Sequence, residues 1–408
     1  MRLALAALVW ALPGLAWAQG AFLAVEVAGS GVARAGHADA RRGQAVHVHL
    51  VVPLGDGRFL TSAPRLEVGR RTIAARDLVR PEPETGATVR WSRIEPRMFH
   101  PPPDDADADP KPYSNSVLFG PHHGRWRGVD PIEYFESPIR GSAGFALTLR
   151  SARPSDRRFD VHGGLGVMRV RAVAVVGTQT LATPGLEAVR PAGIGDEVPR
   201  VTFRGAEGFL GWLTSFHNVP NVFGSAGRGA RHQTAQYAGT DCADVMLGAL
   251  RRATRTPIEF TSVAGLARLT EPVLDARIEN DRLTDPGGRP IRVRFGETVR
   301  PGDLVMIDYG SPSIPRPWAH VGAVFEDRAP GGDSGPDGLF GPEDLLAHTA
   351  FLHGLALQPL ATQAPARIRV VRWNARLRRE LQRGSEFQGF SGDGRARRGR
   401  RVPRSSRQ

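Results

Sequence analysis

Short hydrophobic runs separated by turn residues fill the first half of the chain. Between about residues 21 and 181 these runs are rich in valine, leucine, alanine and phenylalanine. Clusters of glycine, proline, aspartate and serine bound them, as is typical of strands. The runs cover residues 21–29, 44–52, 65–75, 144–152 and 167–181. We therefore expect residues 19–182 to form an all-β domain, most simply an antiparallel sandwich.

The pattern changes after this region. Residues 183–200 contain three prolines and three glycines without periodicity, which predicts a linker. Residues 201–373 are expected to form a second, mixed α+β domain that opens with helical material. Strands are predicted in its later part, at residues 304–309, 320–326 and 345–351.

One helix of the second domain is predicted clearly, over residues 242–252. Cys242, Val245, Met246 and Ala249 recur at i, i+3, i+4 and i+7, which gives the helix one apolar face. Thr240 and Asp241, two residue types that cap helix starts, come directly before it. Cys242 is therefore expected in the first turn.

The first residues have the pattern of an export signal. Arg2 is followed by an apolar run over residues 3–15, and Ala16-Trp17-Ala18 matches a signal-peptidase site. The run is too short to span a bilayer. We expect residues 1–18 to be a signal peptide, cleaved after Ala18, and the mature protein to reach the periplasm or the outside of the cell.

The charge is strongly positive and nearly all of it comes from arginine. The formal net charge is +13, and Lys111 is the only lysine. Arginines concentrate in residues 395–407, a composition that suits a polyanionic partner or a solvated tail. We favour the solvated tail, interpret residues 374–408 as a basic disordered segment, and do not expect a nucleic-acid partner.

Cys242 is the only cysteine in the chain, so an internal disulfide is excluded. Its predicted place at a helix start favours a thiolate, because the helix dipole and the free backbone N–H groups stabilise negative charge. The same N–H groups would stabilise an oxyanion on a substrate. The alternative is a small buried side chain without chemistry.

Two histidines complete a candidate catalytic triad. His320 begins one predicted strand, and its imidazole is suited to take a thiol proton and return it to a leaving amine. His348 lies on the following strand, where a polar group would orient the base. The order nucleophile, base and orienting residue fits nucleophilic catalysis.

These segments resemble the NlpC-type cell-wall endopeptidases, a papain-like superfamily, over roughly residues 216–352. The family has G-x-D-C, P-G-D-L, H-V-G and I-H-A motifs in this order, and an upstream V-P-Y-x-W-G-G. The corresponding segments are Gly239-Thr240-Asp241-Cys242, Pro301-Gly302-Asp303-Leu304, His320-Val321-Gly322, Leu346-Ala347-His348-Thr349 and residues 219–225.

The resemblance implies a papain-like catalytic domain that cleaves peptide or amide bonds, with peptidoglycan as the substrate class and no metal or organic cofactor. It assigns catalysis to Cys242, His320 and His348. Asn221 stands where the family often has a tyrosine near the thiol, and Tyr237 is the candidate substitute. Together with Asp241, these two are the expected substrate-binding residues.

Two other functions stay open. The same triad can transfer an acyl group to an amine instead of water. Alternatively, the domain has lost activity and serves as an exported binding or scaffold protein, since Ala243-Asp244 replaces the Ser-Gly that usually follows the family's cysteine. The β-rich domain is a candidate binder of wall polymer or of an envelope protein.

Overall fold

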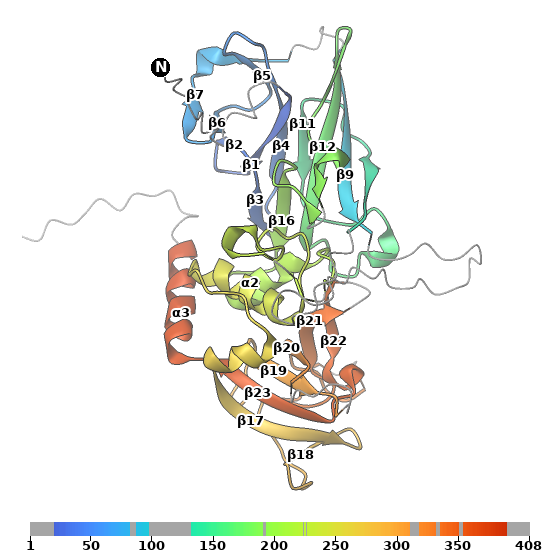
Figure 1. The fold of residues 1–408 in the computed structure, drawn as a ribbon, viewed down its shortest axis with the longest axis vertical. Helices are drawn as coiled ribbons and strands as arrows, with labels where there is room; N and C mark the ends of the chain where they lie inside the picture. The colour runs from blue at the N-terminus through green and yellow to red at the C-terminus, as the bar shows by residue number, and fades with distance from the viewer. Residues whose placement is uncertain are drawn as a thin grey trace, which may run out of the picture.

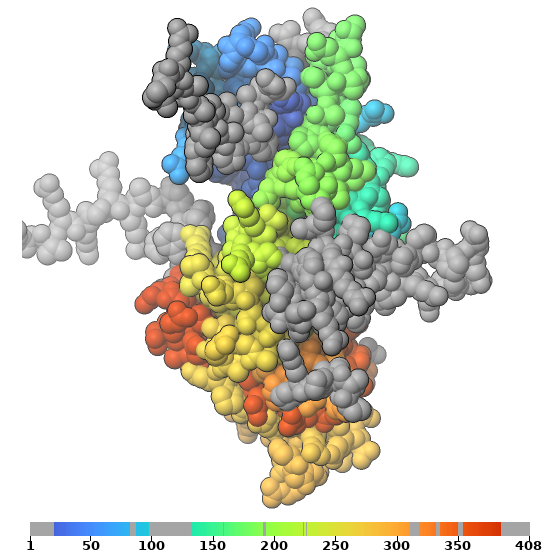
Figure 2. All heavy atoms as spheres, viewed as in Figure 1, coloured from blue at the N-terminus to red at the C-terminus, as the bar shows by residue number. Residues whose placement is uncertain are grey.

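The computed structural model describes residues 20–81, 87–97, 132–190, 193–222, 224–225, 227–310, 318–331, 335–350 and 354–389. The predicted signal peptide and residues 390–408 lie outside this range. The described chain forms two units stacked along the long axis of the molecule, with the β17–β18 hairpin at the end opposite the first unit (Figure 1; Figure 2). The structure is mixed α+β, with far more strand than helix.

The first unit consists of two sheets. One has the order β7-β6-β2-β1-β4-β5-β8, with β11 also paired to β4, and the other has the order β10-β9-β12-β16-β3, with β13 also paired to β12. The strands of the first sheet are β1 (Phe22–Val27), β2 (Ala33–Ala35), β4 (Val46–Pro53), β5 (Phe59–Thr61), β6 (Leu66–Val68), β7 (Arg71–Ile73), β8 (Leu78–Val79) and β11 (Ala146–Leu149). Those of the second are β3 (Ala38–Arg41), β9 (Thr88–Pro96), β10 (Tyr134–Ile139), β12 (Gly166–Val176), β13 (Gln179–Ala182) and β16 (Arg200–Arg204).

The two sheets share one hydrophobic core. Alternate residues of β4 (Val46, Val48 and Leu50) are fully buried in it, and Val170 and Ala172 of β12 meet them from the other sheet. Successive side chains of a strand point to opposite faces, so this alternation places one face of each sheet on the core. The predicted strand segments are confirmed, because each contains at least one strand.

The predicted linker is packed rather than extended. Residues 183–200 include η6 (Leu186–Ala188) and the hairpin of β14 (Val189–Arg190) and β15 (Gly193–Ile194). Ala188 and Ile194 form a buried cluster with Ile94 of β9. Strand β16 then pairs with β12 and, in parallel, with β3. The first unit therefore extends beyond the boundary expected at residue 200.

The second unit is an antiparallel sheet in the order β18-β17-β23-β19-β20-β21-β22, with helices against it. Its strands are β17 (Thr270–Glu279), β18 (Arg282–Thr284), β19 (Leu304–Asp308), β20 (His320–Glu326), β21 (Leu345–Ala350), β22 (Gly354–Pro359) and β23 (Arg367–Trp373). Its helices are α1 (Gly208–Leu213), η7 (Thr214–Phe216), η8 (Gly229–Arg231), α2 (Cys242–Thr254), η9 (Val263–Arg268), η10 (Leu360–Gln363) and α3 (Ala375–Gly389).

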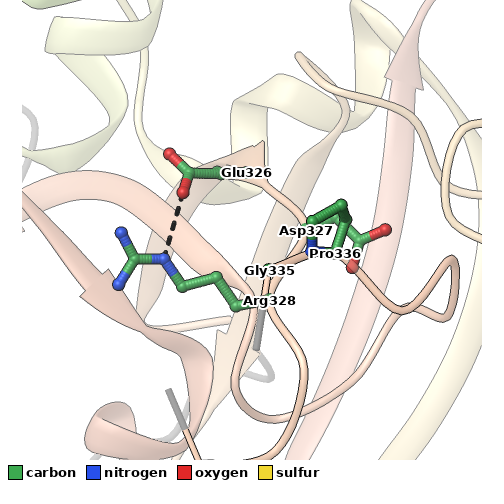
Figure 3. A pocket seen from close by; sticks show the side chains of 5 residues that line it. All are labelled: Glu326, Asp327, Arg328, Gly335 and Pro336. Carbon is green, nitrogen blue, oxygen red and sulfur yellow. Dashed lines mark hydrogen bonds and ion pairs between the residues drawn. The ribbon is translucent and has the colours of Figure 1, made fainter. Parts of the chain in front are cut away.

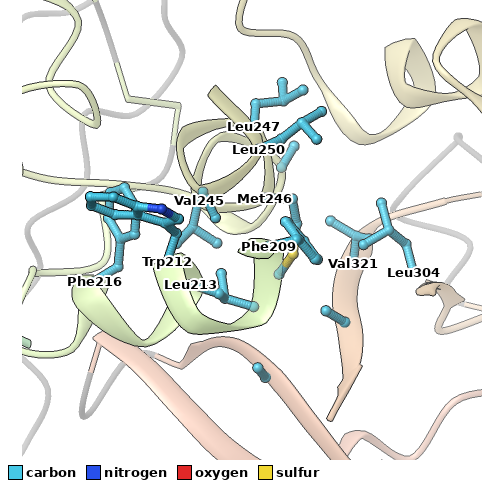
Figure 4. Packing of buried hydrophobic residues seen from close by; sticks show 14 of the residues in the cluster. Phe209, Trp212, Leu213, Phe216, Val245, Met246, Leu247, Leu250, Leu304 and Val321 are labelled. Atoms are coloured by element: carbon cyan, nitrogen blue, oxygen red, sulfur yellow. The ribbon is translucent and has the colours of Figure 1, made fainter. Parts of the chain in front are cut away.

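Helix α2 is the centre of the second core. Val245 and Met246 are fully buried between α1 and the sheet, where Leu304 of β19 and Val321 of β20 meet them (Figure 4). The predicted apolar face of residues 242–252 is thus the face that packs. Burying each such side chain contributes about 1.5–3 kcal/mol, which fixes α2, and with it Cys242, against the sheet.

Helix α3 corrects the expectation of a disordered tail beginning at residue 374. Leu377 is fully buried, Leu381 packs beside it, and a Cβ on Gly384 would lie 2.1 Å from the carbonyl oxygen of Ala253. The helix is polar on its outer side but has an apolar stripe at i and i+4 that docks on α2. Among the described residues, no helix is both long and apolar enough to cross a lipid bilayer.

A buried and a half-buried arginine join the two units. Arg200 of β16 stacks over the ring of Tyr237 at 4.2 Å, and Asp39 of β3 lies 3.7 Å from Arg200 and 3.4 Å from Arg252 of α2. Burial opposes ionisation of Asp39, yet the adjacent guanidinium groups hold the pKa of its carboxyl below its usual value. Helix α2 is therefore anchored to the first unit as well as to its own sheet.

Candidate active site

The nucleophile candidate opens helix α2. Cys242 is the first helical residue, and Asp241 before it has the extended backbone of an N-cap. One carboxylate oxygen of Asp241 accepts hydrogen bonds from the N–H groups of Ala243 (3.0 Å) and Asp244 (2.8 Å). Such a cap stabilises a helix by about 1 kcal/mol. It also occupies two first-turn donors, which leaves the N–H of Cys242 itself for an oxyanion.

The thiol is protonated at rest. Cys242 is half-buried against the α1–α2 core, and burial raises the pKa of its thiol well above the usual range. The negative charges of Asp241 and Asp244 raise the pKa further, and the N–H of Val321 acts in the opposite direction. The expectation of a thiolate at the helix start is therefore wrong, because desolvation and two adjacent carboxyl groups outweigh the helix dipole.

Asp241 and Asp244 are themselves perturbed. Burial raises the pKa of Asp241 to about 6, although four backbone N–H groups act to lower it. Burial, followed by the charge of Asp241, raises the pKa of the Asp244 carboxyl. Ser225 donates a 2.5 Å hydrogen bond to Asp244, and the Nε2 atom of His232 lies 3.6 Å from the same oxygen. This polar cluster lies beneath the start of α2.

The two histidines contact each other. His320 begins β20, and its Nε2 atom lies 3.1 Å from Nδ1 of His348 on β21, with the rings at right angles. His320 is half-buried and His348 is buried. Burial, followed by the charge of His348, lowers the pKa of His320 to about 3. Burial also lowers the pKa of His348. Both rings are therefore neutral at physiological pH.

The glycine of the H-V-G segment makes this contact possible. A Cβ on Gly322 would lie 3.1 Å from Cβ of His348 and 3.3 Å from both Cβ of Leu346 and the carbonyl oxygen of Ala347. Strand alternation places His320 and residue 322 on the same face of the sheet. A glycine at this position lets His348 reach His320 without a shift of either strand.

The sulfur lies at the beginning of the strand that carries His320. Two backbone N–H groups act on the Cys242 thiol, and that of Val321, the residue after His320, has a larger effect than that of Ala243. Tyr309 lies near both residues. Burial, followed by the charge of a Cys242 thiolate, raises the pKa of the Tyr309 hydroxyl to about 12, and the centre of its ring is 6.5 Å from that of His320. Within the described part of the chain, no hydrogen bond joins the thiol to either histidine.

Two glutamines complete the surroundings of His348, and the sequence did not single them out. Nε2 of His348 lies 3.0 Å from Oε1 of Gln358 on β22 and 3.2 Å from Nε2 of Gln363 in η10. Tyr309 donates to Oε1 of Gln363 at 3.3 Å. Gln358 is two residues beyond Ala356, the direct partner of His348 across β21 and β22, so strand pairing was the signal that would have found it.

The structure separates the expected substrate-binding residues. Asn221 is half-buried and forms a bridge with Thr240, so it lies beside the segment that leads into Asp241 and Cys242. Tyr237 is only 2% exposed, its hydroxyl is 2.8 Å from that of Ser215, and its ring stacks on Phe216 at 4.3 Å. Tyr237 is thus a core residue that a substrate does not reach, which corrects its assignment.

A cavity of about 350 Å³ lies elsewhere in the second unit. Glu326, Asp327, Arg328, Gly335 and Pro336 line it (Figure 3). Glu326 ends β20, whereas His320 begins it, so about 20 Å of strand separates the cavity from His320. No group of three or more metal-ligating side chains is present within the described residues. His353 follows the predicted strand of His348, which makes it a poorer choice for the third catalytic residue, and it lies outside the described residues.

Comparison with protein-family models, curated proteins and solved structures found no match to this chain.

Proposed function

We propose that this chain is an exported cysteine hydrolase with a papain-like, NlpC-type catalytic unit that cleaves peptide or amide bonds of peptidoglycan. One observation carries the proposal. The only cysteine opens a helix whose start lies against the strand that begins with His320, and His320 is hydrogen-bonded to a second, buried histidine. Peptidoglycan as the substrate class and export through residues 1–18 rest on the sequence motifs.

The proposed reaction starts from a neutral pair. As Sγ of Cys242 attacks the substrate carbonyl carbon, the thiol proton moves to Nδ1 of His320, the ring nitrogen that His348 does not occupy. The N–H of Cys242 stabilises the oxyanion. The imidazolium then protonates the leaving amine, and a thioester remains on Cys242. Water, deprotonated by His320, releases the acid and restores the thiol.

Keeping both groups neutral at rest suits this sequence of steps. Burial disfavours a resting thiolate–imidazolium pair, so proton transfer accompanies attack instead of preceding it. The thiol and the imidazole have to approach each other for this transfer. Catalytic hydrogen bonds are commonly longer without substrate than in the reacting complex.

The first unit contributes to the nucleophile segment in this proposal. Ile132, just before β10, packs on Val222, and its Cδ1 atom is 3.4 Å from the position of a Cβ on Gly239. Tyr134 donates a 3.4 Å hydrogen bond to the carbonyl of Ala238. The first unit thus supports the loop leading to Cys242, and its outer surface remains the candidate for binding wall polymer or an envelope protein.

Digestion of purified muropeptides tests the proposal. Wild-type protein is expected to yield fragments in which one amide bond has gained the elements of water, identified by mass spectrometry. Cys242→Ala is expected to yield no such fragments. Its midpoint of unfolding in urea is expected to equal that of wild type, because the small side chain is only half-buried. Hydrolysis by the alanine variant at the wild-type rate would reject the mechanism.

A second candidate is an exported binding or scaffold protein without catalysis. The raised pKa of the thiol, the absence of a thiol–imidazole hydrogen bond in the described residues and the Ala243-Asp244 pair favour it. This candidate predicts that wild type and Cys242→Ala bind the same muropeptides and cleave neither.

A further inference from the structure

Nε2 of His348 contacts two side-chain amides that make opposite demands on it. Oε1 of Gln358, at 3.0 Å, accepts a hydrogen bond, whereas the amide nitrogen of Gln363, at 3.2 Å, donates one. A neutral imidazole carries a proton on only one of its nitrogens. The two glutamines therefore favour different tautomers of His348.

The tautomer of His348 decides which nitrogen of His320 carries a proton. When Nε2 of His348 is protonated and donates a hydrogen bond to Gln358, Nδ1 of His348 accepts a hydrogen bond from the protonated Nε2 of His320. Nδ1 of His320 then has no proton and presents a lone pair. When Nδ1 of His348 is protonated, it donates to Nε2 of His320, whose own proton then lies on Nδ1. Only the first arrangement leaves His320 able to accept the thiol proton.

The remaining contacts divide between the two arrangements. The carbonyl oxygen of Thr349, 3.1 Å from Nδ1 of His348, favours the second. Gln363 can bond elsewhere, since its amide nitrogen is 3.4 Å from Oε1 of Gln358 and its oxygen accepts from Tyr309 at 3.3 Å. Gln358 is the shortest contact of Nε2 and provides the acceptor that opposes Thr349.

We propose that Gln358 is a positioning residue that holds His348 with its proton on Nε2 and thereby keeps Nδ1 of His320 as the base. The inference rests on the proposed function for its effect on rate. Its structural part, the tautomer of His348, is independent of any substrate.

Nitrogen NMR of histidine-labelled full-length protein tests this directly. Wild type is expected to show a protonated Nε2 and an unprotonated Nδ1 in His348. Gln358→Leu removes the acceptor and is expected to move the proton to Nδ1 and to lower kcat about 10²- to 10⁴-fold, as expected for a misplaced tautomer. Gln363→Leu removes only the competing donor and is expected to keep the wild-type spectrum.

Two further variants separate positioning from packing. Gln358→Glu keeps an acceptor at the same reach, so it is expected to keep the Nε2 tautomer, to retain activity within about tenfold of wild type, and to shift the acid limb of the pH–rate profile upward. Gln179→Leu, the same change at an exposed position of β13, is expected to alter neither spectrum nor rate.

Two results overturn the inference: a wild-type His348 that is protonated on Nδ1, or a Gln358→Leu spectrum identical to that of wild type. If wild-type protein cleaves no muropeptide, the proposed function fails, but the spectra still decide the tautomer.

Discussion

Gly322 lies on β20, two residues after His320 and next to His348 of β21, and replacing it with alanine is expected to separate the two histidines. The added methyl carbon would lie 3.1 Å from Cβ of His348 and 3.3 Å from Cβ of Leu346. Ordinary contacts between carbon atoms are about 3.5–4.0 Å, so β21 has to move by about 0.4 Å. Since the crowded atoms belong to or lie next to the backbone, side-chain rotation does not relieve the contact.

The cost follows from this geometry. Overpacking of a buried position destabilises by about 1–3 kcal/mol. A 0.4 Å shift of β21 away from β20 would lengthen the 3.1 Å contact between His320 and His348 to about 3.5 Å, beyond a good hydrogen bond. Loss of this orientation is expected to lower the hydrolysis rate about tenfold to hundredfold, as for other small misplacements of catalytic groups.

Urea unfolding and muropeptide hydrolysis measure the two effects separately. Gly341→Ala is the matched control, because a Cβ at Gly341 has no neighbour within 4 Å. It is expected to leave both quantities unchanged. A Gly322→Ala variant with wild-type stability and a wild-type rate would show that the glycine is not needed to make room for His348.

Three further predictions concern stability and the thiol. Leu377→Ala is expected to lower the free energy of unfolding in urea by about 2–5 kcal/mol, since Leu377 is fully buried, and a loss below 0.5 kcal/mol would contradict the docking of α3. The pKa of His320 is lowered to about 3 by burial, so its contribution to stability is complete above pH 6.5 and is lost as the pH falls. Lowering the pH from 7 to 5 is therefore expected to destabilise wild type more than His320→Gln, by at most about 2 kcal/mol in the free energy of unfolding. An equal effect of pH on both proteins would contradict the lowered pKa of His320. Asp241→Asn keeps an oxygen for the cap but removes the charge beside the sulfur, so Cys242 is expected to react with iodoacetamide at lower pH than in wild type; an unshifted profile would show that burial alone holds the proton.

Local patterns predicted the elements that carry the site. The four apolar residues beginning at Cys242 defined the start of α2, and strand β20 covers the predicted residues 320–326. In each case the signal lies within a few residues, because helix faces and strand faces repeat over short distances.

Features that depend on distant parts of the chain were not predictable in this way. Strand β16 joins the first unit by pairing with β3, more than 150 residues earlier. The arginine-rich composition of residues 375–389 predicted a solvated segment and gave no sign that Leu377 packs in the second core. The thiol pKa depends on burial by tertiary contacts, so the helix start alone gave the wrong direction.

The proposed action of an imidazole on the Cys242 sulfur can be measured without knowing the substrate. The measurement is the rate of Cys242 alkylation by iodoacetamide between pH 5 and pH 10 in wild type and in His320→Gln. Wild type is expected to react at least tenfold faster at pH 7, because His320 takes the thiol proton as the sulfur attacks the reagent. Superimposable profiles across the whole range would contradict the claim.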